Sequence, residues 1–199
     1  MDFVTKIKGH TLEYYDSEHL YLVDGITVPS ITQMLGRKFN KRFEGIDKAV
    51  LKRAADEGTK VHEAIEAYCK NGTESDLPEV RNFRWLRNQY KFEVIDNEVP
   101  VILFWHDGTP ISAGRLDMVI RMDGQNGLAD IKRTSSLDKE YLAYQINLYR
   151  IAYMQCYGEK ITFLRGLHLR ENVRKFVKIP VETDMIYDYI KEIRKEKEA

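Results

Sequence analysis

Apolar and polar residues alternate in the first part of the chain, and a short helical pattern follows. From Thr11 to Val28 this alternation, with a turn signal at Asp24-Gly25, predicts small antiparallel strands. A helix of a few residues is expected next, capped by Ser30 or Thr32 and ending at Gly36. The chain therefore begins with a small β region and a short helix.

Helical periodicity dominates the next segment. A helical region is expected over about residues 46–70, interrupted near Gly58, where Thr59 can cap a second helix that ends at Asn71-Gly72. Another helix is expected to begin at Pro78. Its buried face would consist of Val80, Phe83, Leu86 and Tyr90.

The pattern changes to that of strands after residues 96–97. Segments 98–105 and 111–122 read as strands around the turn His106-Asp107-Gly108, and segment 128–134 follows the turn sequence DGQNG. These three segments predict a meander.

A strongly periodic helix follows, from about Leu137 to Tyr157, with Ser135 or Ser136 as its cap and Gly158 beyond its end. Two further strands, 161–169 and 174–181, are expected on either side of a turn at residues 171–172. A charged helix is expected from about residue 183.

This order of elements predicts one α/β domain with a mixed central β-sheet flanked by helices and a small N-terminal β-hairpin region. A chain of 199 residues with 43% hydrophobic side chains is enough for one substantial core. We expect residues 1–44 to form the hairpin region and short helix, and residues 45–199 to form the core that carries the chemistry.

Composition narrows the class of protein. The 31 basic and 31 acidic residues cancel, which argues against a protein that passively coats nucleic acid, so any nucleic-acid footprint would be local. Cys69 and Cys156 lie in apolar helical patterns and read as buried small hydrophobes, and two cysteines exclude a four-cysteine metal site within the chain. No apolar run approaches the ~20 residues that span a bilayer. A soluble, cytoplasmic protein is expected.

Candidate chemistry lies on the meander. Alternation places Asp130 and Lys132 on one face of a strand, so a carboxylate and an ammonium point together. Asp117 lies on the preceding strand and joins them if the loop within DGQNG has an even number of residues or the strand carries a bulge. With Gly124-Gln125 as the loop, Asp117 would sit opposite Lys132; with an odd loop and no bulge it would face away.

Five short motifs together resemble the RecB-like branch of the PD-(D/E)XK nucleases, and are similar to phage and mitochondrial-type single-domain exonucleases. They are VPSITQML, GTKVH with His62, GRLD ending at Asp117, ADIKRT with Asp130-Ile131-Lys132, and the Q-x-x-x-Y pair Gln145 and Tyr149. The resemblance covers roughly Val28 to Tyr153. A strict PD dipeptide is absent, because Leu116 precedes Asp117.

The resemblance implies a restriction-endonuclease-like core and a DNA exonuclease that hydrolyses phosphodiester bonds with Mg²⁺ or Mn²⁺ in phage or repair and recombination pathways. Asp117, Asp130, the backbone carbonyl of Ile131 and His62 would surround the metal, and Lys132 would be the catalytic lysine. Gln145 and Tyr149 would support the site and DNA contact. Arg115, Arg133 and Lys139 surround the proposed site in the sequence and are candidate DNA contacts that could meet phosphates. The expected partners are DNA and a recombinase, a single-strand-binding protein or a helicase. The chain has no phosphate-binding G-x-x-x-x-G-K-[ST] loop, so any unwinding of DNA would come from a partner. A phage-encoded chain would act in the host cytoplasm.

Simpler interpretations remain open for each residue. A lone D-x-K is commonly a surface ion pair, His62 could be an ordinary hydrogen-bonded helical histidine, and the Gln145–Tyr149 pair could be core packing. Glu66 shares a helix face with His62, and Glu98 could bind metal or be a solvated strand-end carboxylate. Trp85 and Trp105 could stack on bases or pack in the core. Alternative functions are a structure-selective or nicking endonuclease and a catalytically silent DNA- or protein-binding module.

Overall fold

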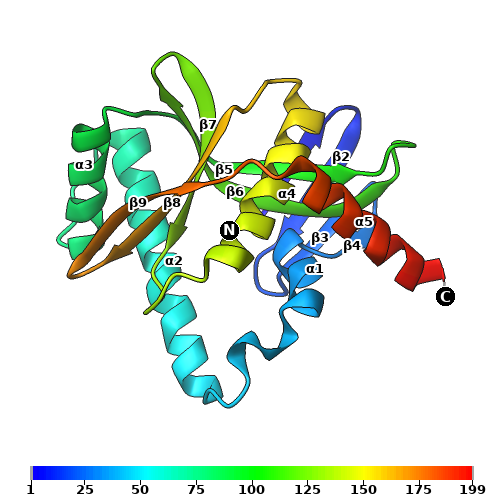
Figure 1. Cartoon of the computed structure of the whole chain (residues 1–199), viewed down its shortest axis with the longest axis horizontal. Coiled ribbons are helices and arrows are strands. Elements are labelled where there is room, and N and C mark those ends of the chain that lie inside the picture. The colour runs from blue at the N-terminus through cyan, green and yellow to red at the C-terminus, as the bar shows by residue number, and fades with distance from the viewer. Residues whose placement is uncertain (1, 199) are drawn as a thin grey trace.

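The computed structural model describes residues 2–198, without the side chains of residues 42, 43 and 196–198. It contains a four-stranded sheet of order β1-β2-β3-β4 and a five-stranded sheet of order β5-β6-β7-β8-β9 with helices on both faces (Figure 1). The expected mixed α/β fold with an N-terminal antiparallel sheet is confirmed. None of the helices described within residues 2–198 is long and apolar enough to cross a membrane.

The N-terminal region is the antiparallel sheet that the alternation predicts. Its strands are β1 (Phe3–Ile7), β2 (His10–Tyr15), β3 (Leu20–Val23) and β4 (Ile26–Val28). Helix α1 (Ile31–Lys38) follows, two residues longer than expected, and a short 3-10 turn η1 (Asn40–Phe43) comes next. Ser30 caps α1 through a capping box with Gln33, each side chain accepting from the backbone N–H of the other residue at 3.0 and 2.8 Å.

Helix α2 (Lys48–Asn71) runs without the expected interruption at Gly58, so the prediction of two helices is wrong. One glycine in a long helix costs only about 1 kcal/mol, and the Arg53–Glu57 pair, at 3.0 Å, supports the turn before it. The helix begins at an Asp47 cap and ends at Gly72 in the left-handed conformation, as the glycine signal predicts.

Helix α3 (Pro78–Tyr90) begins at the proline as predicted and buries Val80, Phe83 and Leu86. Tyr90, expected in the core, is 43% exposed. It is the last helical residue, so its ring reaches the rim of the core and stacks on Phe176 with centroids 4.4 Å apart.

The larger sheet contains the predicted meander of β5 (Glu93–Phe104), β6 (Pro110–Met122) and β7 (Gln125–Lys132). Helix α4 (Lys139–Tyr157) then crosses to β8 (Phe163–Arg170), which pairs with β7 in parallel, and β9 (Val173–Ile179) closes the edge. Asp138 caps α4 by accepting from the N–H of Tyr141 at 3.0 Å, so neither expected serine is the cap.

Two hydrophobic clusters lie on opposite faces of this sheet. One contains the residues that α4, α5 (Thr183–Glu198), α1 and the N-terminal sheet contribute, so the expected hairpin region shares a core with the rest of the chain. The other contains Val61 and Ile65 of α2 and Val80, Phe83 and Leu86 of α3, packed on β6, β7 and β8. The layer order is therefore helix, sheet, helix.

Candidate functional site

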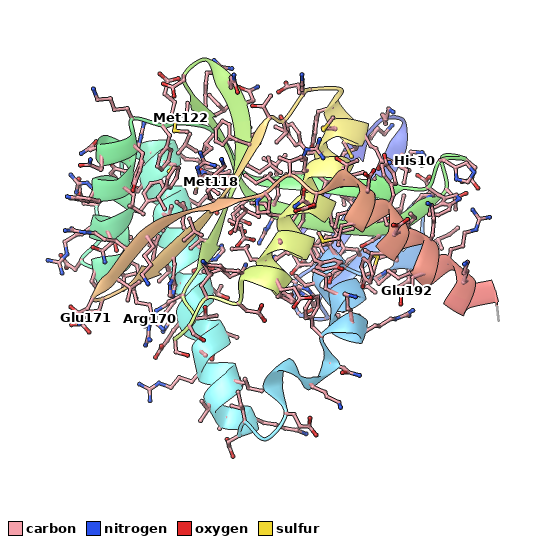
Figure 2. All side chains as sticks on the ribbon, viewed as in Figure 1. His10, Met118, Met122, Arg170, Glu171 and Glu192 are labelled. Atoms are coloured by element: carbon pink, nitrogen blue, oxygen red, sulfur yellow. The ribbon has the colours of Figure 1, made fainter. Side chains whose placement is uncertain are left out.

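Asp117 and Asp130 lie side by side on the meander. The β6–β7 loop is Asp123-Gly124, both with positive φ, and Met118 pairs with Ala129. Extending this register by one position puts Asp117 opposite Asp130, not opposite Lys132, because the two-residue loop lies one position earlier than expected. The required even loop is present, and alternation puts both carboxylates on the sheet face of Val119 and Leu128, which pack in the cluster with α4. Met118, the next residue on β6 (labelled in Figure 2), is buried in the cluster with α2 and α3, on the other face of the sheet.

Asp130 and Lys132 form an ion pair on β7, with 2.5 Å between Nζ and Oδ2 and side chains only 16% and 4% exposed at Lys132 and Asp130. Burial alone would lower the pKa of Lys132, but the carboxylates of Asp130 and Asp117 outweigh it and raise that pKa. Lys132 therefore carries its proton at neutral pH, which suits it to compensate negative charge.

His62 reaches the same place from the middle of α2. Its Nδ1 atom lies 3.6 Å from Oδ1 of Asp117 and 3.6 Å from Oε1 of Glu98. Donor atoms of these three side chains all lie within 4.8 Å of one another, and the three could hold a metal ion. Asp130 lies outside this set of three and adjoins it through Asp117.

Glu98 is the site residue whose position differs most from the sequence prediction, which put it at a strand end. It lies within β5, not at a strand end, and its side chain is only 14% exposed. Its backbone has φ +52°, in the left-handed region, while Asn97 and Val99 keep their pairing with β6. A non-glycine residue held there is strained, and such strain is concentrated at functional sites. The available signal was an acidic residue directly before the apolar run VPVILF.

Close contacts and burial set the positions and pKa values of the charged side chains in the cluster. The Arg115 guanidinium donates toward Oε2 of Glu98 at 2.5 Å and lies over the Tyr14 ring. Burial raises the pKa of Asp117 and, although Lys132 opposes it, raises the pKa of Asp130 to about 6. Burial disfavours charged His62, yet Asp117 and Glu98 outweigh it and raise its pKa to about 9. The site gathers carboxylates that need cationic partners.

Gln145 and Tyr149 are both buried on α4, which lies over the meander. The Tyr149 ring fills the space above Gly114, where a Cβ would come within 3.0 Å of its Cε1 atom. Burial raises the pKa of Tyr149 well above its usual value, with Asp117 and Asp130 adding to the shift. The Oε1 atom of Gln145 is buried and has no hydrogen-bond partner among the described residues.

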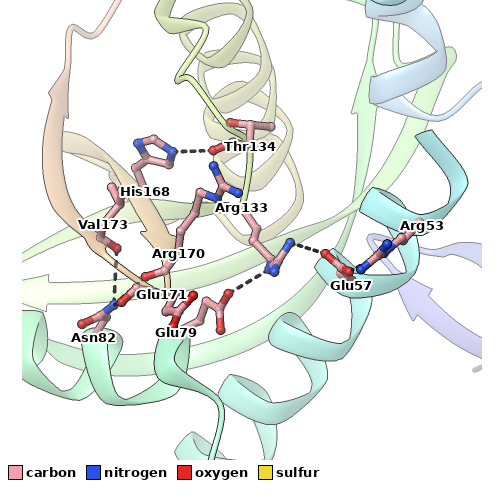
Figure 3. Close-up of polar contacts among 10 residues, drawn as sticks. All are labelled: Arg53, Glu57, Glu79, Asn82, Arg133, Thr134, His168, Arg170, Glu171 and Val173. Carbon is pink, nitrogen blue, oxygen red and sulfur yellow. Dashed lines mark hydrogen bonds and ion pairs between the residues drawn. The ribbon is translucent and has the colours of Figure 1, made fainter. Parts of the chain in front are cut away.

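Arg133 lies apart from the carboxylate cluster. Its Nε and Nη1 atoms donate to Glu79 at 2.8 Å and Glu57 at 2.6 Å, and Glu57 also accepts from Arg53 (Figure 3). Because Glu79 is only 3% exposed, this guanidinium serves as the counter-ion of a buried carboxylate. Arg133, the residue directly after β7, therefore connects the end of this strand to α2 and α3.

The remaining candidate residues lie outside the cluster of His62, Glu98 and Asp117. Glu66 pairs with Lys70 at 2.5 Å and is not among the clustered donors. Trp85 is 42% exposed, whereas Trp105 packs against the core with Arg194 over its ring. Cys69 and Cys156 are both free; Cys156 is buried as expected, whereas Cys69 is only partly buried. Lys139 begins α4.

Comparisons with known proteins give no family. No protein-family model matches the chain. No curated protein matches it either. Among solved structures, the fold is similar to one described as "Crystal structure of SSO0001", with a TM-score of 0.46 and 14% sequence identity over 86% of this chain and 77% of that chain.

Proposed function

We propose that this chain is a divalent-metal-dependent DNA exonuclease of the PD-(D/E)XK type. The observation that carries the proposal is the convergence of His62, Glu98 and Asp117 beside the buried Asp130–Lys132 pair. These residues come from separate segments of the chain. An ordinary surface ion pair between an aspartate and a lysine would not require the other three side chains beside it. The meander, with α4 crossing from β7 to β8, would then be the nuclease core.

The donor set suits a hard divalent ion. Three carboxylates and one imidazole match the ligands that Mg²⁺ and Mn²⁺ accept, and among the described residues the clustered donors include no cysteine. His62, Glu98, Asp117 and Asp130 would hold the ion, with the Ile131 carbonyl as the further ligand that the resemblance implies. When bound, such an ion lowers the pKa of water and polarises a phosphoryl oxygen.

The remaining chemistry falls to the chain's own residues. Lys132, protonated and fixed by Asp130, would compensate charge that builds up on the phosphate and would orient the attacking water. Its raised pKa argues against a role as the base that deprotonates that water. Gln145, whose Oε1 atom is buried without a partner among the described residues, would accept a hydrogen bond from a group bound at the site.

End-labelled single- and double-stranded linear DNA tests the proposal. The wild-type chain should release nucleotides from an end in Mg²⁺ or Mn²⁺, and EDTA should abolish the release. Lys132→Ala should reduce the rate by at least 100-fold; robust metal-dependent cleavage by that variant would remove Lys132 from the mechanism. Cutting of closed circular DNA would indicate an endonuclease instead, and DNA binding without turnover in Mn²⁺ would indicate a silent binding module.

A further inference from the structure

A basic and aromatic surface lies at the sheet edge away from the carboxylate cluster. We define the α3–β9 surface by the exposed or half-exposed residues Arg81, Trp85, Tyr90, Arg165, Arg174, Phe176 and Lys178. Helix α3 packs against β8 and β9, and β9 is an edge strand (Figure 1). The side chain of Asn82 fixes this arrangement by donating to backbone carbonyls of the β8–β9 turn, including that of Arg170 at 2.6 Å (Figure 3).

Charge is strongly segregated here, although the whole chain is neutral. Residues 78–91 contain four Lys or Arg and one Glu, and residues 163–179 contain five Lys or Arg and one Glu. One of the two acidic residues, Glu79, is buried against Arg133 and cannot neutralise the surface. The other, Glu171, lies in the β8–β9 turn. The surface is therefore a local basic patch.

Two cations face each other directly on this surface. Arg165 and Lys178 are paired across β8 and β9, and neither has a carboxylate partner among the residues with described side chains. Like charges opposite each other on a sheet are destabilising. The arrangement costs stability in the isolated chain, and an anion lying across the two strands would offset that cost.

Aromatic rings lie among these cations. The Arg174 guanidinium lies over the Trp85 ring, 4.1 Å from its centroid, and Trp85 is still 42% exposed. Tyr90 stacks on Phe176, and the Arg165 guanidinium lies 5.3 Å from the Phe176 centroid. Stacking on a ring leaves N–H groups of a guanidinium able to reach phosphate, although Nη1 of Arg165 also donates to the Leu164 carbonyl at 2.9 Å. The ring and the guanidinium plane offer faces to a base.

From this arrangement we infer that the α3–β9 surface binds single-stranded nucleic acid, away from the carboxylate cluster. Single strands satisfy both features, because phosphates meet the unpaired cations and exposed bases stack on the rings. An acidic polypeptide would account for the cations alone, and duplex DNA hides the faces of its bases. The choice of nucleic acid as the polyanion rests on the proposed function, whereas the polyanion site itself does not.

Trp85 provides a direct readout. The chain has two tryptophans, so Trp105→Phe leaves Trp85 as the sole indole fluorophore. Titration of this full-length variant with a 20-nucleotide oligo-dT in EDTA should quench its fluorescence, since bases stack on the ring. Absence of quenching at concentrations that saturate binding would overturn the inference.

Variants of the α3–β9 surface then test whether oligo-dT binds there and not elsewhere on the chain. Arg174→Gln should weaken oligo-dT binding in EDTA three- to tenfold and should lower the slope of log K against log salt by about 0.7. Trp85→Ala should weaken it at least fivefold. Arg84→Gln is the matched control on the same helix, because Arg84 is already paired with Glu74 at 2.6 Å. Equal affinities for Arg174→Gln and Arg84→Gln would contradict the inference, and thermal melting checks that each variant folds.

Two further experiments identify the class of ligand and test the α3–β9 surface independently of the proposed nuclease activity. Poly-glutamate should displace oligo-dT poorly at equal charge; equal displacement would indicate an acidic protein partner and would overturn the assignment to nucleic acid. Binding that depends on Arg174, in a chain that fails to cleave DNA in Mg²⁺ or Mn²⁺, would sustain this surface while the proposed activity fails. If the chain cleaves DNA but Arg174→Gln leaves oligo-dT binding unchanged, the proposed activity stands and the α3–β9 surface is overturned.

Discussion

Asp117 accepts a hydrogen bond from the backbone N–H of Ile131, with 2.6 Å between the nitrogen and Oδ2, across two neighbouring strands. This contact fixes one carboxylate oxygen and leaves the other, Oδ1, directed toward His62 at 3.6 Å. A carboxylate held by the backbone of a sheet is pre-organised, because its position does not depend on a loop. The candidate site is therefore built on rigid elements.

The first prediction concerns Glu98. Glu98→Gln removes one negative charge and one oxygen donor from the three clustered side chains, so affinity for Mn²⁺ should fall at least tenfold. Isothermal titration of the metal into the full chain measures this change.

Glu66→Gln is the matched control for that experiment. Glu66 lies one turn from His62 on α2 and is paired with Lys70 on the helix surface, so its loss should leave Mn²⁺ affinity unchanged within twofold. If both variants bound the metal like the wild type, the three-residue cluster would not be a metal site.

A second prediction concerns Lys132 and stability. Lys132→Met removes the cation beside two buried carboxylates, and leaving such charges without a partner costs about 3 kcal/mol. Urea unfolding in EDTA at neutral pH should show this loss, whereas the exposed Lys6→Met should change the free energy of unfolding by less than about 0.5 kcal/mol. A fully stable Lys132→Met chain would show that the two carboxylates do not both carry charge.

Much of the fold follows from local signals in the sequence. Gly72 and Gly158 end helices where the left-handed conformation is needed, and the meander follows from alternation and turn residues. The two helix errors have different causes. At Gly58 the packing of a long helix outweighs a weak local signal. At α4 the cap is itself a local signal, because Asp138 is as good a cap as Ser135 or Ser136 and lies directly before the helix. Pairing between β7 and β8 depends on contacts distant in sequence and could not be predicted from patterning.

The candidate site was predictable in part. Asp117, Asp130 and Lys132 follow from strand alternation once the loop length is known, and only the structure fixes the loop at Asp123-Gly124. Glu98 could not be assigned, because its role depends on a left-handed backbone conformation that no local pattern encodes for glutamate. Its approach to His62 also joins β5 to a helix far earlier in the chain.

The third prediction tests what Arg133 does. Arg133→Met leaves Glu79 buried without its counter-ion and should lower the free energy of unfolding by about 3 kcal/mol. Arg53→Met removes an exposed partner of the same Glu57 and should cost less than about 1 kcal/mol. The double variant Arg133→Met with Glu79→Leu should regain most of the loss, because both charges are gone. An Arg133→Met chain of full stability but weakened oligonucleotide binding would make this arginine a DNA contact instead.

The last prediction concerns the glycine three residues before Asp117. A Cβ at Gly114 would lie 3.0 Å from Cε1 and 3.1 Å from the hydroxyl oxygen of Tyr149, whose ring is held in the core. Gly114→Ala must displace either the ring or the strand and should lower the free energy of unfolding by about 2 kcal/mol. Gly36→Ala is the opposite case, since nothing lies within 4 Å of its Cβ position in α1, and helix propensity should stabilise the chain by up to about 1 kcal/mol. Because the two changes add the same methyl group, opposite signs in urea unfolding would isolate the contact with Tyr149. A further loss of metal affinity in Gly114→Ala alone would show that Tyr149, by packing on β6, keeps Asp117 in position.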